Sequence, residues 1–210
     1  MNEELSNAML ELKRDDVLRT VKQGLESGDD PLRILEACRR GMALVGERFQ
    51  SGDYYLAEMM LAGEIFKSVV AVLDPHLSDA RRARPRGKVV LATLKGDIHD
   101  LGKDLLATLL RAQGFEVLDL GVDVDPSTAV RQIKSSAPDF VGFSALLTSA
   151  FPNMKAAAEL LEEEGLRSGL KLMVGGGVTT ALVRDYVGAD FQTTDAMQGV
   201  AYCLRETEGK

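Results

Sequence analysis

The hydrophobic pattern changes near residue 80, and this change constrains the fold of the 210-residue chain more than any other feature. Up to residue 80, apolar residues recur at spacings of three and four, which is the period of one helix face. From residue 88 onward, short apolar runs alternate with helical stretches. We therefore predict a helical domain over residues 1–80, a linker over residues 81–87 and an α/β domain over residues 88–210.

The first domain is expected to be a small antiparallel bundle of three or four amphipathic helices with short turns. Asp30-Pro31 is a good helix start, because Asp caps the first N–H groups and Pro fits the first helical position. Pro75 is expected to end the set. The predicted buried faces hold Val17, Val21 and Leu25 in one helix, Leu35, Cys38, Met42, Val45 and Phe49 in the next, and Leu56, Met59, Gly63, Phe66, Val70 and Leu73 in the last.

The second domain is expected to be a doubly wound, flavodoxin-like parallel sheet of five strands. Strands that alternate with helices are joined by right-handed crossovers, which leave the strands parallel. Asp125-Pro126 repeats the helix start signal of Asp30-Pro31. Ligands of such sheets bind at the carboxyl ends of the strands. The expected strands span residues 88–94, 115–120, 139–143, 171–174 and 189–192, and the expected helices span residues 102–112, 126–136, 151–164, 179–187 and 195–205.

Composition argues against several functional classes. The formal net charge is -7 at pH 7, which disfavours a nucleic-acid binder. The one basic cluster, within residues 81–88, surrounds Pro85 and is interpreted as a solvated linker. Cys38 and Cys203 show neither metal-ligand spacing nor a disulfide framework, which favours a reducing cytoplasm. The charged N-terminal stretch has no apolar signal core, and no run approaches the roughly 20 apolar residues of a membrane span, so we expect a cytoplasmic protein.

The residues that bear chemistry lie in the loops after the expected strands. The first of these loops contains His99, one of only two histidines, within Gly96-Asp97-Ile98-His99-Asp100-Leu101-Gly102. Ser144-Ala145-Leu146-Leu147-Thr148 follows the third strand, and Gly175-Gly176-Gly177 follows the fourth. Glycines let a backbone approach a ligand closely, because no Cβ intervenes. These three loops therefore predict one ligand site at the edge of the sheet.

These strings resemble the motifs of the cobalamin-binding fold, namely Asp97-x-His99-x-x-Gly102, Ser144-x-Leu146 and Gly175-Gly176, in the expected order and loops. The helical half is similar to the cap of the methionine-synthase type. Gly46-Glu47-Arg48-Phe49 and Gly52-Asp53-Tyr54-Tyr55-Leu56 carry that likeness. The resemblance covers nearly the whole chain, which looks like a stand-alone corrinoid protein of the methyltransferase systems of methanogens and acetogens.

The resemblance implies a bound cobalamin or related corrinoid in the base-off/His-on state. The cofactor's own nucleotide base would be buried in the sheet domain, and His99 would be the axial cobalt ligand. Neutral imidazole is a good ligand for a transition metal, and the Asp97 carboxylate would hold its other ring nitrogen. The glycines would make room for the nucleotide tail. The implied cofactor-binding residues are Gly96, Asp97, Ile98, His99, Asp100, Gly102, Ser144, Leu146, Thr148, Gly175, Gly176 and Gly177.

One position departs from the family pattern. Methionine synthase extends the Asp–His pair with a hydroxyl group six residues after the motif serine, but that position here is Ala150. Thr148 or Ser149 could substitute for it, or the chain of hydrogen bonds could stop at Asp97. The residues alone leave these alternatives open.

Several of the residues in and around these motifs also have a plain structural interpretation. Asp100 could cap the helix that follows it, and Lys103 is expected on the surface of that helix. Ser144 could merely end a strand, and the glycine run could be only a flexible turn. The pairs Tyr54-Tyr55 and Met59-Met60 could shield a cofactor-bound methyl group, although such residues are more often plain core.

The function implied by the resemblance is methyl transfer. The corrinoid would accept a methyl group on Co(I) from a substrate-specific methyltransferase and carry it as methylcobalamin. A second methyltransferase would then pass it to a thiol or folate-type acceptor. We expect no catalysis by the chain alone, and we expect a reductive activator as a further partner.

Two other classes of function use related folds. The first is an adenosylcobalamin mutase subunit or a cobalamin-dependent sensor. Mutase cobalamin domains normally lack this cap, and the sensors use a tryptophan-bearing cap motif, whereas this chain has no tryptophan. The second is a receiver-like signalling domain, which is disfavoured because Phe143-Ser144 stands where a phospho-accepting Asp is needed.

Overall fold

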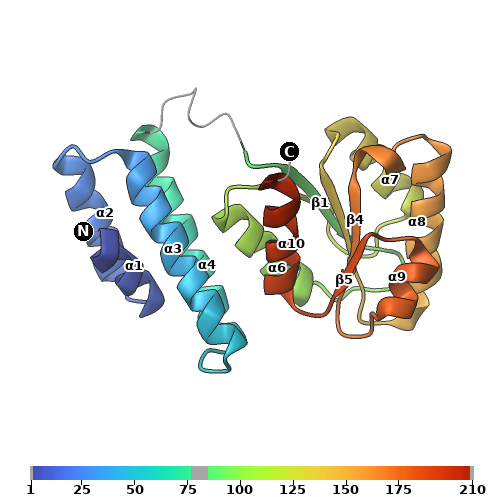
Figure 1. Ribbon diagram of the computed structural model, residues 1–210, viewed down its shortest axis with the longest axis horizontal. Coiled ribbons are helices and arrows are strands. Elements are labelled where there is room, and N and C mark those ends of the chain that lie inside the picture. Colours follow the sequence, from blue (N-terminus) through green and yellow to red (C-terminus); the bar gives the residue numbers. More distant parts are fainter. Residues whose placement is uncertain (1, 77–84, 209–210) are drawn as a thin grey trace. The chain divides into compact units, whose positions relative to one another are not determined.

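The structure is a computed structural model that describes residues 2–76 and 85–208. The chain divides into two compact units, residues 1–85 and residues 86–210, seen in Figure 1 as a helical part and a part built around a sheet. The linker predicted over residues 81–87 lies mostly outside the described residues. No helix in the two described ranges combines the length and the apolar composition needed to cross a membrane.

The first unit consists of helices, as predicted. Asp30 starts the third of them, where its carboxylate accepts the N–H of Leu32 at 3.0 Å and Pro31 occupies the first turn. Pro75 lies in a short 3-10 turn, η1 (Asp74–His76), which follows the last helix. The helices are α1 (Asn2–Leu10), α2 (Arg14–Glu26), α3 (Pro31–Gln50) and α4 (Leu56–Leu73).

Helix α1 carries a weak apolar pattern that the sequence interpretation did not recognise. Its Leu5 and Met9 side chains are fully buried, and Ser6 donates a hydrogen bond to the carbonyl of Ala37 at 2.8 Å. A Cβ on Gly41 of α3 would lie 2.4 Å from the Cβ of Met9. This glycine is therefore what allows α1 and α3 to approach each other so closely.

The buried face of α4 is wider than predicted, because it also includes Ala62 and Ile65, and one residue of the predicted face is exposed. Val70 is 38 % exposed, and the neighbouring Val69 is buried instead. Much of the surface of α4 is apolar, so spacing alone does not identify which of two adjacent valines faces the core. The other residues of the predicted faces are buried or half-buried.

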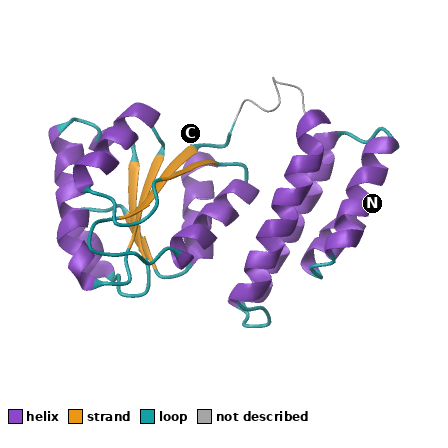
Figure 2. Ribbon diagram, turned by 180° about the vertical axis from the view of Figure 1, so that it is seen from behind, coloured by secondary structure: helices purple, strands orange, loops and turns teal. Residues whose placement is uncertain are grey.

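The second unit is a five-stranded parallel sheet with helices on both faces, as predicted. The strand order is β2-β1-β3-β4-β5 with every pairing parallel, which is the flavodoxin-like order. Helices α6 and α10 cover one face, and α7, α8 and α9 cover the other (Figure 1 and Figure 2). The strands are β1 (Lys88–Thr93), β2 (Glu116–Asp119), β3 (Phe140–Ser144), β4 (Lys171–Gly175) and β5 (Phe191–Thr193), and the helices are α6 (Leu101–Ala112), α7 (Pro126–Ser136), α8 (Phe151–Glu163), α9 (Ala181–Val187) and α10 (Ala196–Glu208).

The element boundaries differ from the predicted ones by up to three residues. Leu94 lies beyond β1 and pairs with Val124 in an isolated bridge, so the pairing of this edge continues past the regular strands. The last strand begins at Phe191 rather than at residue 189. Helix α7 begins as predicted, because the Asp125 carboxylate accepts the N–H of Ser127 at 3.0 Å.

The strand order reverses at β1, because β2 and β3 lie on opposite sides of it. The helix that leaves β1 covers one face of the sheet, and the helix that leaves β3 covers the other. Ligands of doubly wound sheets bind outside the carboxyl ends of two such strands, and this region is called the crevice below. Two of the three predicted motifs lie in the loops that border this crevice.

Candidate functional site

Asp97 joins the β1 loop (residues 94–100) to the β3 loop (residues 145–147). Its side chain has no exposed surface. One carboxylate oxygen, Oδ1, accepts the backbone N–H of His99 at 3.0 Å and the ring Nδ1–H of His99 at 2.7 Å. The other, Oδ2, accepts the backbone N–H groups of Leu146 at 2.6 Å and Leu147 at 2.8 Å. A single buried carboxylate therefore ties together the two loops of the crevice.

These hydrogen bonds keep Asp97 ionised although it is buried. Burial by itself raises the pKa of a carboxyl group, because its charge is less stable away from water. The N–H groups of His99, Leu146 and Leu147 and the His99 ring outweigh burial and lower the pKa of Asp97 to about 2. At neutral pH the crevice thus contains a fixed negative charge beside the His99 ring.

The His99 ring is fixed on one side and open on the other. A carboxylate can only accept a hydrogen bond, so Nδ1 carries the proton and Nε2 of the neutral ring keeps its lone pair. The side chain is 47 % exposed. The hydroxyl of Thr93, the fully buried last residue of β1, donates to the His99 carbonyl at 3.0 Å. The arrangement offers a metal an oriented imidazole nitrogen.

The second oxygen of Asp97 binds backbone N–H groups and not a side-chain hydroxyl group. The second oxygen of Asp97 is filled by the peptides of the β3 loop, whereas Ser149 donates its hydroxyl to the Gly96 carbonyl at 3.3 Å. Thr148 is exposed and begins the 3-10 turn η2 (Thr148–Ala150), and Ala150 is fully buried. Of the alternatives left open by the sequence, the geometry favours the one in which the chain of hydrogen bonds stops at Asp97.

The glycines at the end of β4, Gly175 and Gly176, are packed against protein, whereas Gly102 faces open space. A Cβ on Gly176 would lie 2.1 Å from the carbonyl oxygen of Ala145, and its φ is +105°. A Cβ on Gly175 would lie 3.2 Å from the carbonyl oxygen of Thr193. At Gly176 the missing side chain therefore makes room for the backbone of the β3 loop. At Gly102 a Cβ would meet nothing within 4 Å, which leaves room for a ligand.

Exposed apolar side chains lie in the same two loops. Ile98, Leu146 and Leu147 are exposed, Ile98 by 69 %, and so is Leu101 in the first turn of α6. Apolar groups gathered on a surface commonly mark a binding site. The crevice therefore combines an oriented imidazole, an apolar rim and open space, which suits a large and partly apolar ligand that carries a metal.

Comparison with known families agrees with this geometry. A B12 binding domain family matches residues 87–201, more than half of the chain, and a second B12 binding domain family matches residues 1–74. The chain belongs to the B12-binding family. The first match includes the β1, β3 and β4 loops, and the second includes helices α1 to α4.

Individual relatives of this B12-binding protein match both units. The dimethylamine corrinoid protein of Methanosarcina barkeri is 36% identical over 201 residues, which are 95% of this chain and 93% of the relative. A solved cobalamin-binding protein from Desulfitobacterium hafniense DCB-2 is 37% identical, covers 98% of both chains and has a TM-score of 0.83. The methanol:cobalamin methyltransferase complex MtaBC from Methanosarcina barkeri, at 24% identity, shares the fold, with a TM-score of 0.87 over 99% of this chain and 79% of that chain.

Two structural predictions near the site of this B12-binding protein are wrong. The Asp100 side chain caps none of the described N–H groups of α6, although its backbone carbonyl accepts the N–H of Asp104 at 2.8 Å. Lys103, expected on the surface, is 4 % exposed, and its ammonium group lies 2.6 Å from carboxylate oxygens of Asp104 and Asp119. Its spacing of one turn from the buried Ala107 already indicated the inner face of α6.

The remaining predicted residues divide between core and surface. Ser144 is half-buried and ends β3, as the structural interpretation had it. In the helical unit, Met59 is fully buried and the Tyr54 hydroxyl donates to a backbone carbonyl of α1 at 2.7 Å, so both serve the bundle. Tyr55 and Met60 are exposed, and they remain candidates for contact with a ligand.

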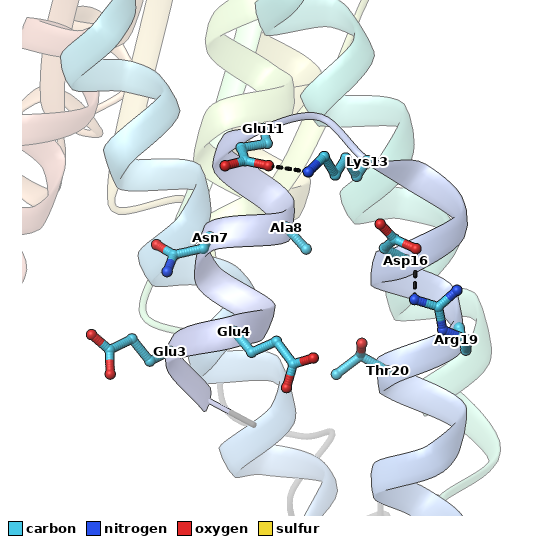
Figure 3. Close-up of a pocket in the computed structure, with 9 residues that line it drawn as sticks. All are labelled: Glu3, Glu4, Asn7, Ala8, Glu11, Lys13, Asp16, Arg19 and Thr20. Carbon is cyan, nitrogen blue, oxygen red and sulfur yellow. Dashed lines mark hydrogen bonds and ion pairs between the residues drawn. The ribbon is translucent and has the colours of Figure 1, made fainter.

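The helical unit also contains a cavity of about 560 Å³ between α1 and α2, drawn in Figure 3. Four of its charged side chains form two ion pairs, Lys13 with Glu11 and Arg19 with Asp16. None of the predicted cofactor-binding residues lines it. The residues that line this cavity all belong to the helical unit.

Proposed function

We propose that this B12-binding protein is a corrinoid methyl carrier. Cobalamin or a related corrinoid binds at the crevice between the β1 and β3 loops, with its own base off the cobalt and Nε2 of His99 as the axial ligand. A substrate-specific methyltransferase loads a methyl group, and a second methyltransferase removes it. The observation that carries the proposal is the His99 ring, held through Nδ1 at 2.7 Å by the buried Asp97 and 47 % exposed.

The residues at the crevice fit a corrinoid. A corrin ring supplies its own nitrogen ligands around the cobalt, so a protein needs to add only an axial donor such as an oriented imidazole. The exposed Ile98, Leu101 and Leu146 suit the apolar edge of a macrocycle. The open space at Gly102 suits the nucleotide tail. When bound, the cobalt supplies the methyl-transfer chemistry.

The task of the chain itself is to hold and tune the imidazole. The fixed charge of Asp97 strengthens His99 as a donor through the Nδ1–H bond. Thr93 fixes the backbone of His99, and the β3 loop fixes Asp97. As cofactor contacts, the other candidates stay predictions; they are Gly96, Ile98, Asp100, Gly102, Ser144, Leu146, Thr148, Gly175, Gly176 and Gly177.

Methyl transfer is supported by the names of similar proteins. The relative at 36% identity is a dimethylamine corrinoid protein, and a protein of the same fold occurs in a methyltransferase complex. We assign the helical domain, residues 1–80, the role of a cap that covers the cofactor, with the exposed Tyr55 and Met60 as candidate contacts. A reductive activator completes the proposed set of partners.

The axial ligand is tested with the full chain, labelled with the heavy isotope of nitrogen and reconstituted with a corrinoid. The electron paramagnetic resonance spectrum of its Co(II) form is expected to show nitrogen splitting that changes with the label, because the nitrogen belongs to the protein. His99→Ala is expected to remove this splitting. His76→Ala is the matched control, since His76 is the other histidine and is exposed in η1. A label-dependent splitting that survives in His99→Ala would exclude His99 as the ligand.

The methyl carrier is tested separately. The reduced holoprotein is methylated chemically and mixed with a corrinoid-dependent thiol methyltransferase, and the methylated thiol is measured. We expect stoichiometric transfer that requires both proteins. Firm retention of adenosylcobalamin without methyl release would instead favour a mutase subunit or a sensor.

A further inference from the structure

We propose that Asp123 is a positioning residue for the axial histidine. Asp123 lies in the segment between β2 and α7, and it contacts Gly96 and Asp97 of the β1 loop, directly before His99. The inference rests on the proposed function, because it concerns how the chain presents His99 to a corrinoid. Asp123 lies outside the three sequence motifs that indicated the site.

The contacts of Asp123 with the β1 loop are reciprocal. Its Oδ1 accepts the backbone N–H of Gly96 at 2.9 Å, and its own N–H donates to the carbonyl of Asp97 at 3.0 Å. One residue thus binds two consecutive residues of the loop through both its side chain and its backbone. Because the Asp97 carboxylate holds the His99 ring, fixing the Asp97 backbone also fixes the direction of the ring.

The backbone of Asp123 is held in an uncommon conformation. Its φ is +53°, in the left-handed region that few residues other than glycine adopt. Asp and Asn tolerate this region better than other side chains, because their short polar groups bond locally. Such a conformation persists only where the surroundings enforce it, and it is concentrated at functional sites. At Asp123 the contacts that enforce it are those to the β1 loop.

The neighbouring backbone shows why this contact sets the course of the loop. The N–H of Val124 donates to the Thr93 carbonyl at 3.1 Å, and the N–H of Lys95 donates to the Val124 carbonyl at 2.9 Å, so the edge stays paired up to residue 95. Asp123 continues that pairing to the next two residues. On the other side of the loop, Asn153 donates to the Lys95 carbonyl at 2.7 Å. The loop is therefore clamped from both sides directly before it presents His99.

Asp123→Gly and Asp123→Asn separate this role from a general structural one. Glycine removes the bond to Gly96 but accepts the positive φ without strain, so the fold should be kept. Asparagine keeps an acceptor oxygen and tolerates the same φ. Ala137→Gly is the matched control, since Ala137 also has a positive φ, of +45°, at the end of α7 and away from the crevice.

The readouts are the melting temperature of the apoprotein, corrinoid affinity, and the His99 nitrogen splitting of the Co(II) form. Asp123→Gly is expected to melt near the parent but to lose or broaden the splitting and to bind the corrinoid about 10-fold more weakly, as is typical of residues that orient metal ligands. Asp123→Asn and Ala137→Gly are expected to match the parent in both cofactor readouts.

Two results would overturn the role of Asp123, namely an unchanged splitting and affinity in Asp123→Gly, or a lost splitting in Asp123→Asn. Both presuppose a parent protein that shows the histidine splitting. A parent without that splitting would instead reject the proposed axial ligand, so the two failures are distinguishable.

Discussion

The β1 loop and the glycine run Gly175-Gly176-Gly177 both lie at the carboxyl ends of strands in one sheet. Their conformations are stabilised in different ways. The β1 loop depends on a buried charge, because the Asp97 carboxylate collects N–H groups from two loops. The glycine run depends on the absence of side chains, because the backbone of Ala145 leaves no room for a Cβ on Gly176. A loop can thus be stabilised either by a buried polar group or by the absence of a side chain. Substitutions in the two loops should therefore lower the unfolding free energy for different reasons.

The largest effect is expected where a methyl group is added to the glycine run. Gly176→Ala would place a Cβ 2.1 Å from the Ala145 carbonyl oxygen at a φ of +105°, so the β3 loop must move. Overpacking and backbone strain together should cost roughly 4 kcal/mol of unfolding free energy. Urea unfolding measures the loss. A change below about 1 kcal/mol would show that the loop yields easily and would remove the distinction between the two loops.

A somewhat smaller loss is expected when the charge of the β1 loop is removed. Asp97→Asn keeps the size but turns an amide NH₂ toward groups that donate hydrogen bonds, which should cost about 3 kcal/mol. Leu147→Ala is the control, because it keeps the N–H that binds Asp97. That control should lose about 1 kcal/mol or less in the same urea experiment, since Leu147 is 43 % exposed.

The same charge predicts a pH dependence of stability. The pKa of Asp97 falls from 3.8 to about 2 on folding, so the stabilisation is complete above pH 3.8 and is lost as the pH falls through about 2. The shift corresponds to about 2 kcal/mol. Between pH 3.8 and about 2, the unfolding free energy of the apoprotein should therefore decrease less in Asp97→Asn than in the parent. Equal slopes would mean that Asp97 is not the group responsible.

The smallest effect on folding is expected at Gly102, the glycine that faces open space. Gly102→Ala should leave stability unchanged or raise it by up to about 1 kcal/mol, because alanine favours a helix. It should weaken corrinoid binding about 10-fold, equivalent to about 1.4 kcal/mol, because the methyl group takes ligand space. The melting temperature and the corrinoid affinity should be measured on the same variant. Gly102→Ala should change only the affinity appreciably, whereas Gly176→Ala should lower the stability of the fold.

The fold was largely predictable because its signals are local. Asp30-Pro31 and Asp125-Pro126 start helices where expected, and the alternation after residue 88 corresponds to five parallel strands. Helix α1 escaped notice because only Leu5 and Met9 form its fully buried face. Lys103 was misplaced because its charge suggested the surface, although two carboxylates pair with it inside.

The sequence identified the side chains of the candidate site but not the backbone contacts that hold them. His99 and Asp97 stand out as residue types, and the structure brings them into contact at 2.7 Å. The N–H groups of the β3 loop leave no trace in a sequence, since every residue but proline has one. Asp123 carried no motif, and its role depends on a backbone angle. A glycine run fits either open space or close packing, and the choice depends on which residues the fold brings beside it.

The hydrogen bonds from the β3 loop to Asp97 affect which substitutions the site can accept. Peptide N–H groups at positions 146 and 147 are present whatever side chain is attached, proline excepted. At these positions the backbone binds Asp97, whereas the side chain determines the exposed surface. Substitutions of Leu146 or Leu147 can alter what meets a cofactor or a partner while the carboxylate stays held. The hydrogen bonds that hold Asp97 therefore place no demand on the side chains at these two positions.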